Sequence, residues 1–136
     1  MEQIDTIKGH TEYSMSGCNF FNNTSAFGGA ISAINIENIT ISNCTFENNS
    51  ALVDTNKTDK IHNQGFGGGI YLSCSNNKCE TIMRDNNVFK YNYAQKAGGG
   101  IKWEDIEPIF ISKPIYLNNI ALIYGNDIGS FSQKLI

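Results

Sequence analysis

The stretch CNFFNNTSAFGGAI (residues 18–31) decides the fold, because the chain repeats its pattern three more times. An insert at residues 52–65 splits the next copy into CTFENNSA and FGGGIYLSC, and the last two are NVFKYNYAQKAGGGIKW (residues 87–103) and PIYLNNIALIYGNDI (residues 114–128). Each copy has an aromatic residue, an asparagine three residues later and an isoleucine at its end. In chain order these positions are Phe20, Phe46, Phe89 and Tyr116; Asn23, Asn49, Asn92 and Asn119; and Ile31, Ile70, Ile101 and Ile128.

The spacing of the copies separates the possible repeat architectures. Successive aromatics lie 26, 43 and 27 residues apart, and the insert explains the long interval, so the period is about 26. Leucine-rich repeats would need a leucine-asparagine signature, and helical repeats would need a 3.6-residue periodicity with few glycines. Short alternating runs such as INIENITIS (residues 34–42), bounded by Gly, Asn and Ser, instead indicate strands. We therefore predict an all-β, single-stranded parallel β-helix (a solenoid) of about 4–5 coils.

Each recurring position has a predicted role in such a coil. The aromatics and isoleucines should point inward and pile up along a continuous core. The asparagine should occupy a turn, adopt left-handed backbone and bond its counterpart in the next coil. The paired glycines should form a tight corner, since no Lys-Ser/Thr pair follows to make a phosphate loop. Within residues 34–42, the alternation places Ile34, Ile36, Ile39 and Ile41 inward.

The tetrapeptide FxxN, followed by GGAI or GGGI, resembles the repeat of chlamydial polymorphic outer membrane proteins. The last copy, extended to NNIALIYGNDIGS (residues 118–130), is more similar to large β-helix surface proteins of ciliates and other protists. The resemblance covers residues 18–131 and implies a surface or extracellular β-helix that adheres, coats or assembles, without an active site. The chain departs from the pattern at the insert and at residues 125–127, where GND replaces GGA.

Length and charge exclude several classes of function. A chain of 136 residues is expected to form a single β-helix domain, residues 1–136. A net charge of −3 and a single arginine, Arg84, argue against nucleic-acid binding, which needs a basic patch. No apolar run is long enough for a transmembrane segment. The first residues lack the basic head and apolar centre of a signal peptide.

The ends of the predicted solenoid show no obvious polar cap. Terminal coils of a solenoid expose unpaired backbone and core side chains, so they need a cover. We therefore expect the chain to be a segment of, or a subunit in, a longer assembly. Its partners would be copies of itself stacked end to end, each end serving the other, or flanking repeats of the same polypeptide.

The four cysteines divide into two pairs by position. Cys18 and Cys44 stand one period apart, each two residues before its aromatic, so their Cα atoms should lie within disulfide reach. Cys74 and Cys79 flank the short loop SNNK. We predict disulfides Cys18–Cys44 and Cys74–Cys79, with buried free thiols as the alternative.

Acceptor triplets for N-glycosylation, N-x-[ST], are dense in the first half of the chain. Asn23 also heads such a triplet, but its recurring turn position makes it a poor acceptor. If the chain enters a eukaryotic secretory pathway, we expect glycans at several of the other sites. In a bacterial or cytosolic protein these asparagines would be unmodified. The predicted glycosylation sites are Asn22, Asn38, Asn43, Asn48 and Asn56.

No catalytic, metal or cofactor site is predicted, apart from covalent N-glycans. A zinc site of the cysteines with His10 and His62 is disfavoured because no CxxC occurs, and no Ser-His-Asp arrangement can be argued. The best candidate for a carbohydrate contact is Trp103 with its acidic neighbours Glu104, Asp105 and Glu107. However, Trp103 stands two residues after Ile101, so strand alternation favours packing in the core.

Two non-enzymatic functions remain. The first is a structural extracellular or cell-surface protein, a glycosylated β-helix unit that stacks end to end into a fibre or coat. The alternative is an adhesin or carbohydrate-binding module that uses the insert as its contact loop. The uncapped ends and scattered glycosylation triplets favour the structural unit.

Overall fold

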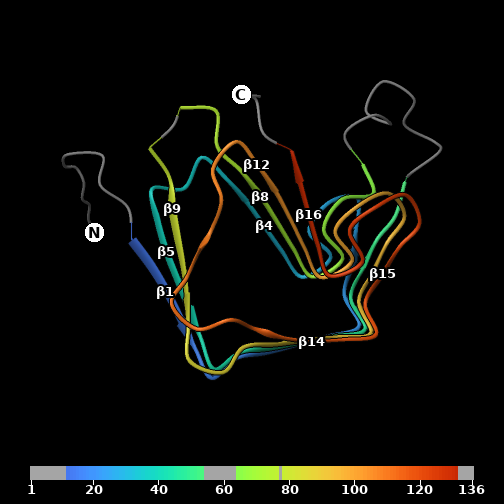
Figure 1. Ribbon diagram of the computed structural model, residues 1–136, viewed down its shortest axis with the longest axis horizontal. Helices are drawn as coiled ribbons and strands as arrows, with labels where there is room; N and C mark the ends of the chain where they lie inside the picture. The colour runs from blue at the N-terminus through green and yellow to red at the C-terminus, as the bar shows by residue number, and fades with distance from the viewer. Residues whose placement is uncertain (1–11, 54–63, 77, 132–136) are drawn as a thin grey trace, which may run out of the picture.

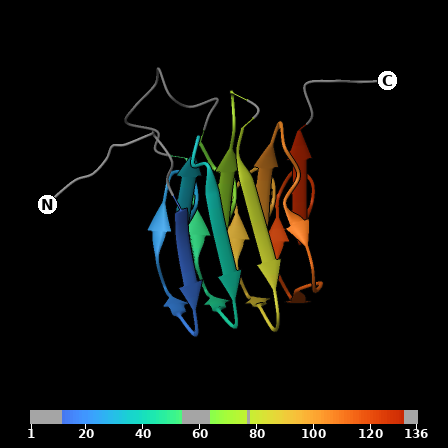
Figure 2. The ribbon, with the colours of Figure 1, turned by 90° about the vertical axis from the view of Figure 1, so that its left-hand side faces the viewer.

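The computed structural model describes residues 12–53, 64–76 and 78–131, and all regular structure in these ranges is β-strand. The described residues form sixteen short strands, which wind into four coils of four strands each. Seen along the stack, equivalent strands of successive coils superimpose (Figure 1). Seen from the side, the coils follow one another in chain order, from blue to red (Figure 2). The predicted parallel β-helix is confirmed.

Each coil contributes one strand to each of four sheets. The first coil holds β1 (Glu12–Ser16), β2 (Asn19–Phe21), β3 (Thr24–Ser25) and β4 (Ile31–Ile34). The second holds β5 (Asn38–Ser42), β6 (Thr45–Glu47), β7 (Ser50–Ala51) and β8 (Ile70–Ser73). The third holds β9 (Glu80–Arg84), β10 (Val88–Lys90), β11 (Tyr93–Ala94) and β12 (Ile101–Glu104). The fourth holds β13 (Ile109–Phe110), β14 (Ile115–Leu117), β15 (Ile120–Ala121) and β16 (Ile128–Phe131).

Pairing between the coils is parallel throughout. The sheets run β1-β5-β9-β13, β2-β6-β10-β14, β3-β7-β11-β15 and β4-β8-β12-β16. The register places each recurring residue opposite its own counterpart, as for Phe20↔Phe46 and Ile31↔Ile70. Because neighbouring strands lie about 4.8 Å apart, like side chains are brought into direct contact.

A column of aromatic rings forms the centre of the core. Ring centroids of Phe20 and Phe46 lie 4.8 Å apart, those of Phe46 and Phe89 4.6 Å, and those of Phe89 and Tyr116 5.9 Å. Phe46 and Phe89 are fully buried, whereas Phe20 and Tyr116, in the outer coils, are partly exposed. The predicted aromatic stack is therefore present in all four coils.

The isoleucine column runs parallel to the aromatic column on the fourth sheet. Ile70 and Ile101 are fully buried, and Ile31 and Ile128 pack against the same core from the outer coils. Within residues 34–42, Ile39 and Ile41 are buried as predicted. The prediction for Ile34 was wrong: its side chain is 48% exposed, because strand β4 alternates inward at Ile31 and Ala33.

The turn after the second sheet differs from the sequence prediction in one respect. The left-handed residue is not the recurring asparagine but the residue before it, with φ of 57° at Asn22, 58° at Asn48, 58° at Tyr91 and 53° at Asn118. Asparagine tolerates this backbone, which explains its use in three of the four coils. The recurring asparagine is thereby left to bond between coils.

Truncating the aromatic column should destabilise the fold strongly. We expect Phe46→Ala to lower the free energy of unfolding by about 3–5 kcal/mol, because the fully buried ring loses both flanking rings and leaves a cavity. Phe21→Ala is the control, since Phe21 is 49% exposed, and it should change stability by no more than about 0.5 kcal/mol. Urea unfolding followed by circular dichroism measures both. Equal losses would contradict the core assignment.

Candidate functional site

The recurring asparagines form a hydrogen-bonded ladder along the axis of the stack. Nδ2 of Asn23 donates to Oδ1 of Asn49 at 3.0 Å, Asn49 to Asn92 at 3.0 Å, and Asn92 to Asn119 at 2.9 Å. The backbone N–H groups of Asn23, Asn49 and Asn92 donate to the same three oxygens, each at 3.0 Å. Each amide oxygen after the first thus accepts two bonds from the preceding coil.

The ladder is also tied to the aromatic strands. Nδ2 of Asn92 donates to the carbonyl of Phe46 at 2.9 Å, and Asn49 and Asn119 make the equivalent bonds to Phe20 and Phe89. Asn49, Asn92 and Asn119 are buried, so these bonds satisfy amides that would otherwise be costly to bury. The bonds from one ladder asparagine to the next all run from the earlier coil to the later one, which gives the stack a direction.

Glycine corners let consecutive coils approach closely. The second glycine of each corner is Gly29, Gly68 or Gly99, and its backbone faces the next coil. A Cβ at any of the three would overlap the carbonyl oxygen of the same position one coil later. These residues must be glycine wherever another coil follows.

The first coil presents an open end, which we call the first-coil face: the outer edges of β1, β2, β3 and β4. Each of these strands is terminal in its sheet among the described residues. Asn23 is exposed here, and Met15, Phe20 and Ile31 are only partly buried, although their counterparts in the next coil are fully buried. A hollow of about 320 Å³ adjoins the first coil, lined by Tyr13, Ser14, Met15, Ile31, Ser32, Ala33, Ile36 and Ile39.

Comparison with known proteins agrees with this architecture. Residues 43–73, which include β6, β7 and β8, match the Chlamydia polymorphic membrane protein repeat. These residues are similar to one repeat of that family, and the described part of the chain is a parallel β-helix. The match and the stacked parallel strands together confirm the resemblance seen in the sequence. No curated protein and no solved structure matches the chain significantly.

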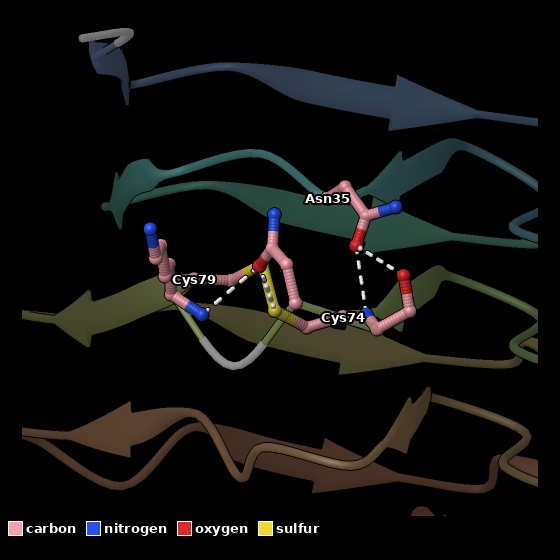
Figure 3. Close-up of a disulfide and its surroundings, with 6 residues drawn as sticks. Asn35, Cys74 and Cys79 are labelled. Carbon is pink, nitrogen blue, oxygen red and sulfur yellow. Dashed lines mark hydrogen bonds between the residues drawn. A yellow bond between two sulfur atoms is a disulfide. The ribbon is translucent and has the colours of Figure 1, made fainter. Parts of the chain in front are cut away.

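One of the two predicted disulfides of this repeat protein is present. Cys74 and Cys79 are bonded, with an S–S distance of 2.08 Å and Cα atoms 6.0 Å apart (Figure 3). The bond closes the short connection between β8 and β9. Beside it, Oδ1 of Asn35 accepts the backbone N–H of Ser75 at 2.7 Å and its hydroxyl at 3.2 Å, which joins this connection to the coil before (Figure 3).

The predicted Cys18–Cys44 disulfide is absent, and both residues are free thiols. Equivalent side chains of parallel neighbours point in the same direction, and each thiol donates to a carbonyl of its own coil, Ser16 or Ser42. Burial raises the pKa of the Cys44 thiol, which favours the neutral form. The third residue of this column is Asn87, whose Oδ1 accepts the Cys44 N–H at 2.9 Å.

The glycosylation triplets differ in accessibility. Asn22, Asn43 and Asn48 are exposed, whereas Asn38 is half-buried within β5. Asn43 accepts a 3.5 Å bond from the N–H of Asn86. Asn56 lies outside the described residues, as does most of the insert. Asn22 and Asn48 therefore offer the most accessible amides at equivalent turns of neighbouring coils.

The acidic group beside Trp103 is part of a packed outer surface. Trp103 points inward and packs against the core, as the alternation predicted.

Lys102 lies on the opposite side of β12 and is only 1% exposed. Its Nζ lies 3.2 Å from Glu104 Oε2 and 4.8 Å from the Phe66 ring centroid. Burial, with a further contribution from Glu104, raises the pKa of Tyr71 to about 12. No sequence pattern predicted the burial of Lys102, because the ring that covers it, Phe66, comes from the glycine corner of the preceding coil.

The described ranges contain neither a cluster of metal-ligating side chains nor a helix that could span a membrane. No three His, Cys, Asp or Glu side chains of these ranges gather to hold a metal ion, and His10 and His62 lie outside them. No helix in this part of the chain could span a membrane.

Replacing a ladder asparagine should destabilise the fold more than replacing an asparagine of the left-handed turn. We expect Asn92→Ala to lower the free energy of unfolding by about 2–4 kcal/mol, because buried partners in both neighbouring coils lose their bonds. The control is Asn48→Gly, since Asn48 is exposed and left-handed, and its effect should be below about 0.5 kcal/mol. Urea unfolding checks the pair. Similar values for the two would contradict the ladder's role.

Proposed function

We propose that the chain is a structural, surface-exposed β-helix unit that assembles across the first-coil face, with a second copy as its partner. The matched repeat is named for membrane proteins of Chlamydia, which supports a location at a cell surface. The regular stack of four coils, each paired with the next in all four sheets, supports a structural role. The proposal includes no catalytic step and no cofactor.

The observation that carries the proposal is the outward-facing backbone of the first-coil face, to which no strand of the described residues is paired. Gly17 N–H donates to the Ser42 carbonyl at 3.1 Å, toward the second coil. Backbone direction alternates along a strand, so the N–H groups of Ser16 and Ser14 point away from that coil. In the third sheet, Ser50 donates to the Asn23 carbonyl at 2.8 Å, so the N–H of Thr24 also points outward from the stack.

A second β-helix fits this face better than a flexible ligand does. The edge consists of four short strands held in fixed positions, and a copy of the chain also offers an edge of four short strands. Pairing would satisfy the backbone donors by strand addition and would cover the partly buried Met15 and Ile31. The adhesin alternative depends on the insert, most of which lies outside the described residues.

Blocking the edge with proline should prevent assembly. Ser14→Pro removes an outward N–H and places a ring on the edge, without removing a bond to the second coil. Sedimentation velocity over a dilution series should show concentration-dependent association of the wild type and of Ser14→Ala, and a monomer for Ser14→Pro. Thr24→Pro repeats the test on another strand, and circular dichroism confirms that each variant is folded. A wild type that stays monomeric, or folded proline variants that associate normally, would overturn the proposal.

We also propose that Asn22 and Asn48 carry N-glycans when the chain is secreted by a eukaryotic cell. Both are exposed at left-handed turns, and a glycan there would project laterally, away from the core. Enzymatic deglycosylation should lower the intact mass by the mass of the glycans, and Asn22→Gln with Asn48→Gln should reduce this difference by the glycans of those two sites. Half-buried Asn38 is the comparison site and should stay unmodified. An unchanged mass would contradict the proposal.

A further inference from the structure

The fourth coil breaks the glycine rule that the other three obey. At the second position of the corner, Gly29, Gly68 and Gly99 each pack against the coil that follows. A Cβ on Gly99 would overlap the carbonyl of Asn126 and would lie 2.7 Å from both the nitrogen and the oxygen of Ile120. The fourth coil has Asn126 at this position. Its side chain therefore occupies the space through which the backbone of another coil would run.

Asn126 also satisfies a backbone donor that another coil would otherwise bind. Ile120 and Leu122 donate back to the carbonyls of Asn92 and Ala94 at 2.9 and 3.2 Å. By alternation, the N–H of Ala121 points forward, away from the third coil. Oδ1 of Asn126 accepts this N–H at 2.9 Å. A side-chain oxygen thus replaces the carbonyl of a following strand.

Asp127 ends the asparagine ladder in the same way. Within the stack, each Nδ2 donates forward to the Oδ1 of the next asparagine. At Asn119 the forward acceptor is instead Oδ1 of Asp127, at 3.2 Å. Asn119 is buried and its Nδ2 also donates to the Phe89 carbonyl, so a ladder that stopped without a forward acceptor would leave the other N–H of this buried amide unsatisfied. A carboxylate supplies a strong acceptor at this point.

We propose that Asn126 and Asp127 cap the stack at the fourth coil. They accept hydrogen bonds from two forward donors of that face, the Ala121 N–H and Asn119 Nδ2, and exclude the backbone of another coil at the corner. The cap needs no other part of the molecule, so it stands whether or not the proposed assembly is correct. The cap is an alternative to the expectation that each end of the β-helix serves as the other's partner.

The cap limits the kind of assembly that a second copy can form. Head-to-tail stacking joins two different faces and leaves an open filament, whereas joining the same face of two copies closes the assembly. With the fourth coil capped, the first-coil face is the one of the two described ends that is left for strand addition. This consequence rests on the proposed function, and it limits that assembly to a closed pair.

A covalent tandem tests the cap independently of association in solution. Phe131 is joined to Glu12 of a second copy through NIE, the connection between β4 and β5, so that the second copy can stack only on the fourth coil. With the natural residues, we expect the tandem to unfold in urea with the midpoint and slope of the single chain. With Asn126→Gly and Asp127→Gly, the copies should stack and unfold at higher urea with a larger slope, because more surface is exposed at once.

A matched variant separates the steric effect from the hydrogen bond. In the tandem with Asn126→Ala and Asp127→Gly, the hydrogen bond to the Ala121 N–H is lost, but the alanine Cβ still occupies the space that another coil needs. This tandem should therefore behave like the natural one. A natural tandem that already unfolds as one larger unit would overturn the proposal. So would a double-glycine tandem that keeps the single-chain slope. In the single chain, Asn126→Gly should speed hydrogen exchange of the Ala121 amide by about tenfold or more, and an unchanged rate would also count against the cap.

Discussion

The structure depends on the in-register parallel pairing of one coil with the next. At a spacing of about 4.8 Å, every side chain has its own counterpart as neighbour, so only residues that pack well against themselves can occupy a column. Phenylalanine meets this condition by stacking, with Phe46 within 9° of parallel to Phe20 and within 3° of parallel to Phe89. Asparagine meets it because its amide is both donor and acceptor. The sequence repeats because each column requires such a residue at the same position of every coil.

The same pairing gives the stack a direction. Each ladder asparagine donates forward and accepts from behind, so the two ends are chemically different. The first-coil face carries an acceptor end at Asn23, which is exposed, and the fourth coil carries a donor end at Asn119, which is buried. The donor end is completed within the chain by Asp127. A β-helix can therefore be open at one end and closed at the other.

This asymmetry connects the fold to its proposed use. Interior coils contribute stability, since their side chains and backbone are satisfied on both sides. Specificity of assembly is left to the end coils, where the repeat pattern is broken or ends. Two features outside the core act locally. The Cys74–Cys79 disulfide closes the connection between β8 and β9, and Lys102 packs with Glu104 and Phe66 on one outer surface. None of them alters how coils meet.

Much of the interior was predictable, because the period alone decides which residues become neighbours. Phe20, Phe46, Phe89 and Tyr116 had to align once one repeat made one coil, and the asparagines followed. The sequence did not show which residue of the turn adopts the left-handed backbone, because the adjacent Asn22 and Asn23 both tolerate it. The spacing of Cys18 and Cys44 suited a disulfide, but side chains that point the same way remain thiols.

The sequence by itself determined the columns and therefore the fold class. It also displayed the departure at Asn126 and Asp127, but not its meaning. Only the tertiary structure decided that, because the role of a side chain at the rim depends on which backbone groups face it and on the space beyond them. The burial of Lys102 was decided in the same way, since the ring above it comes from a distant corner. Periodicity specifies neighbours, whereas orientation and the ends of the stack are properties of the folded chain.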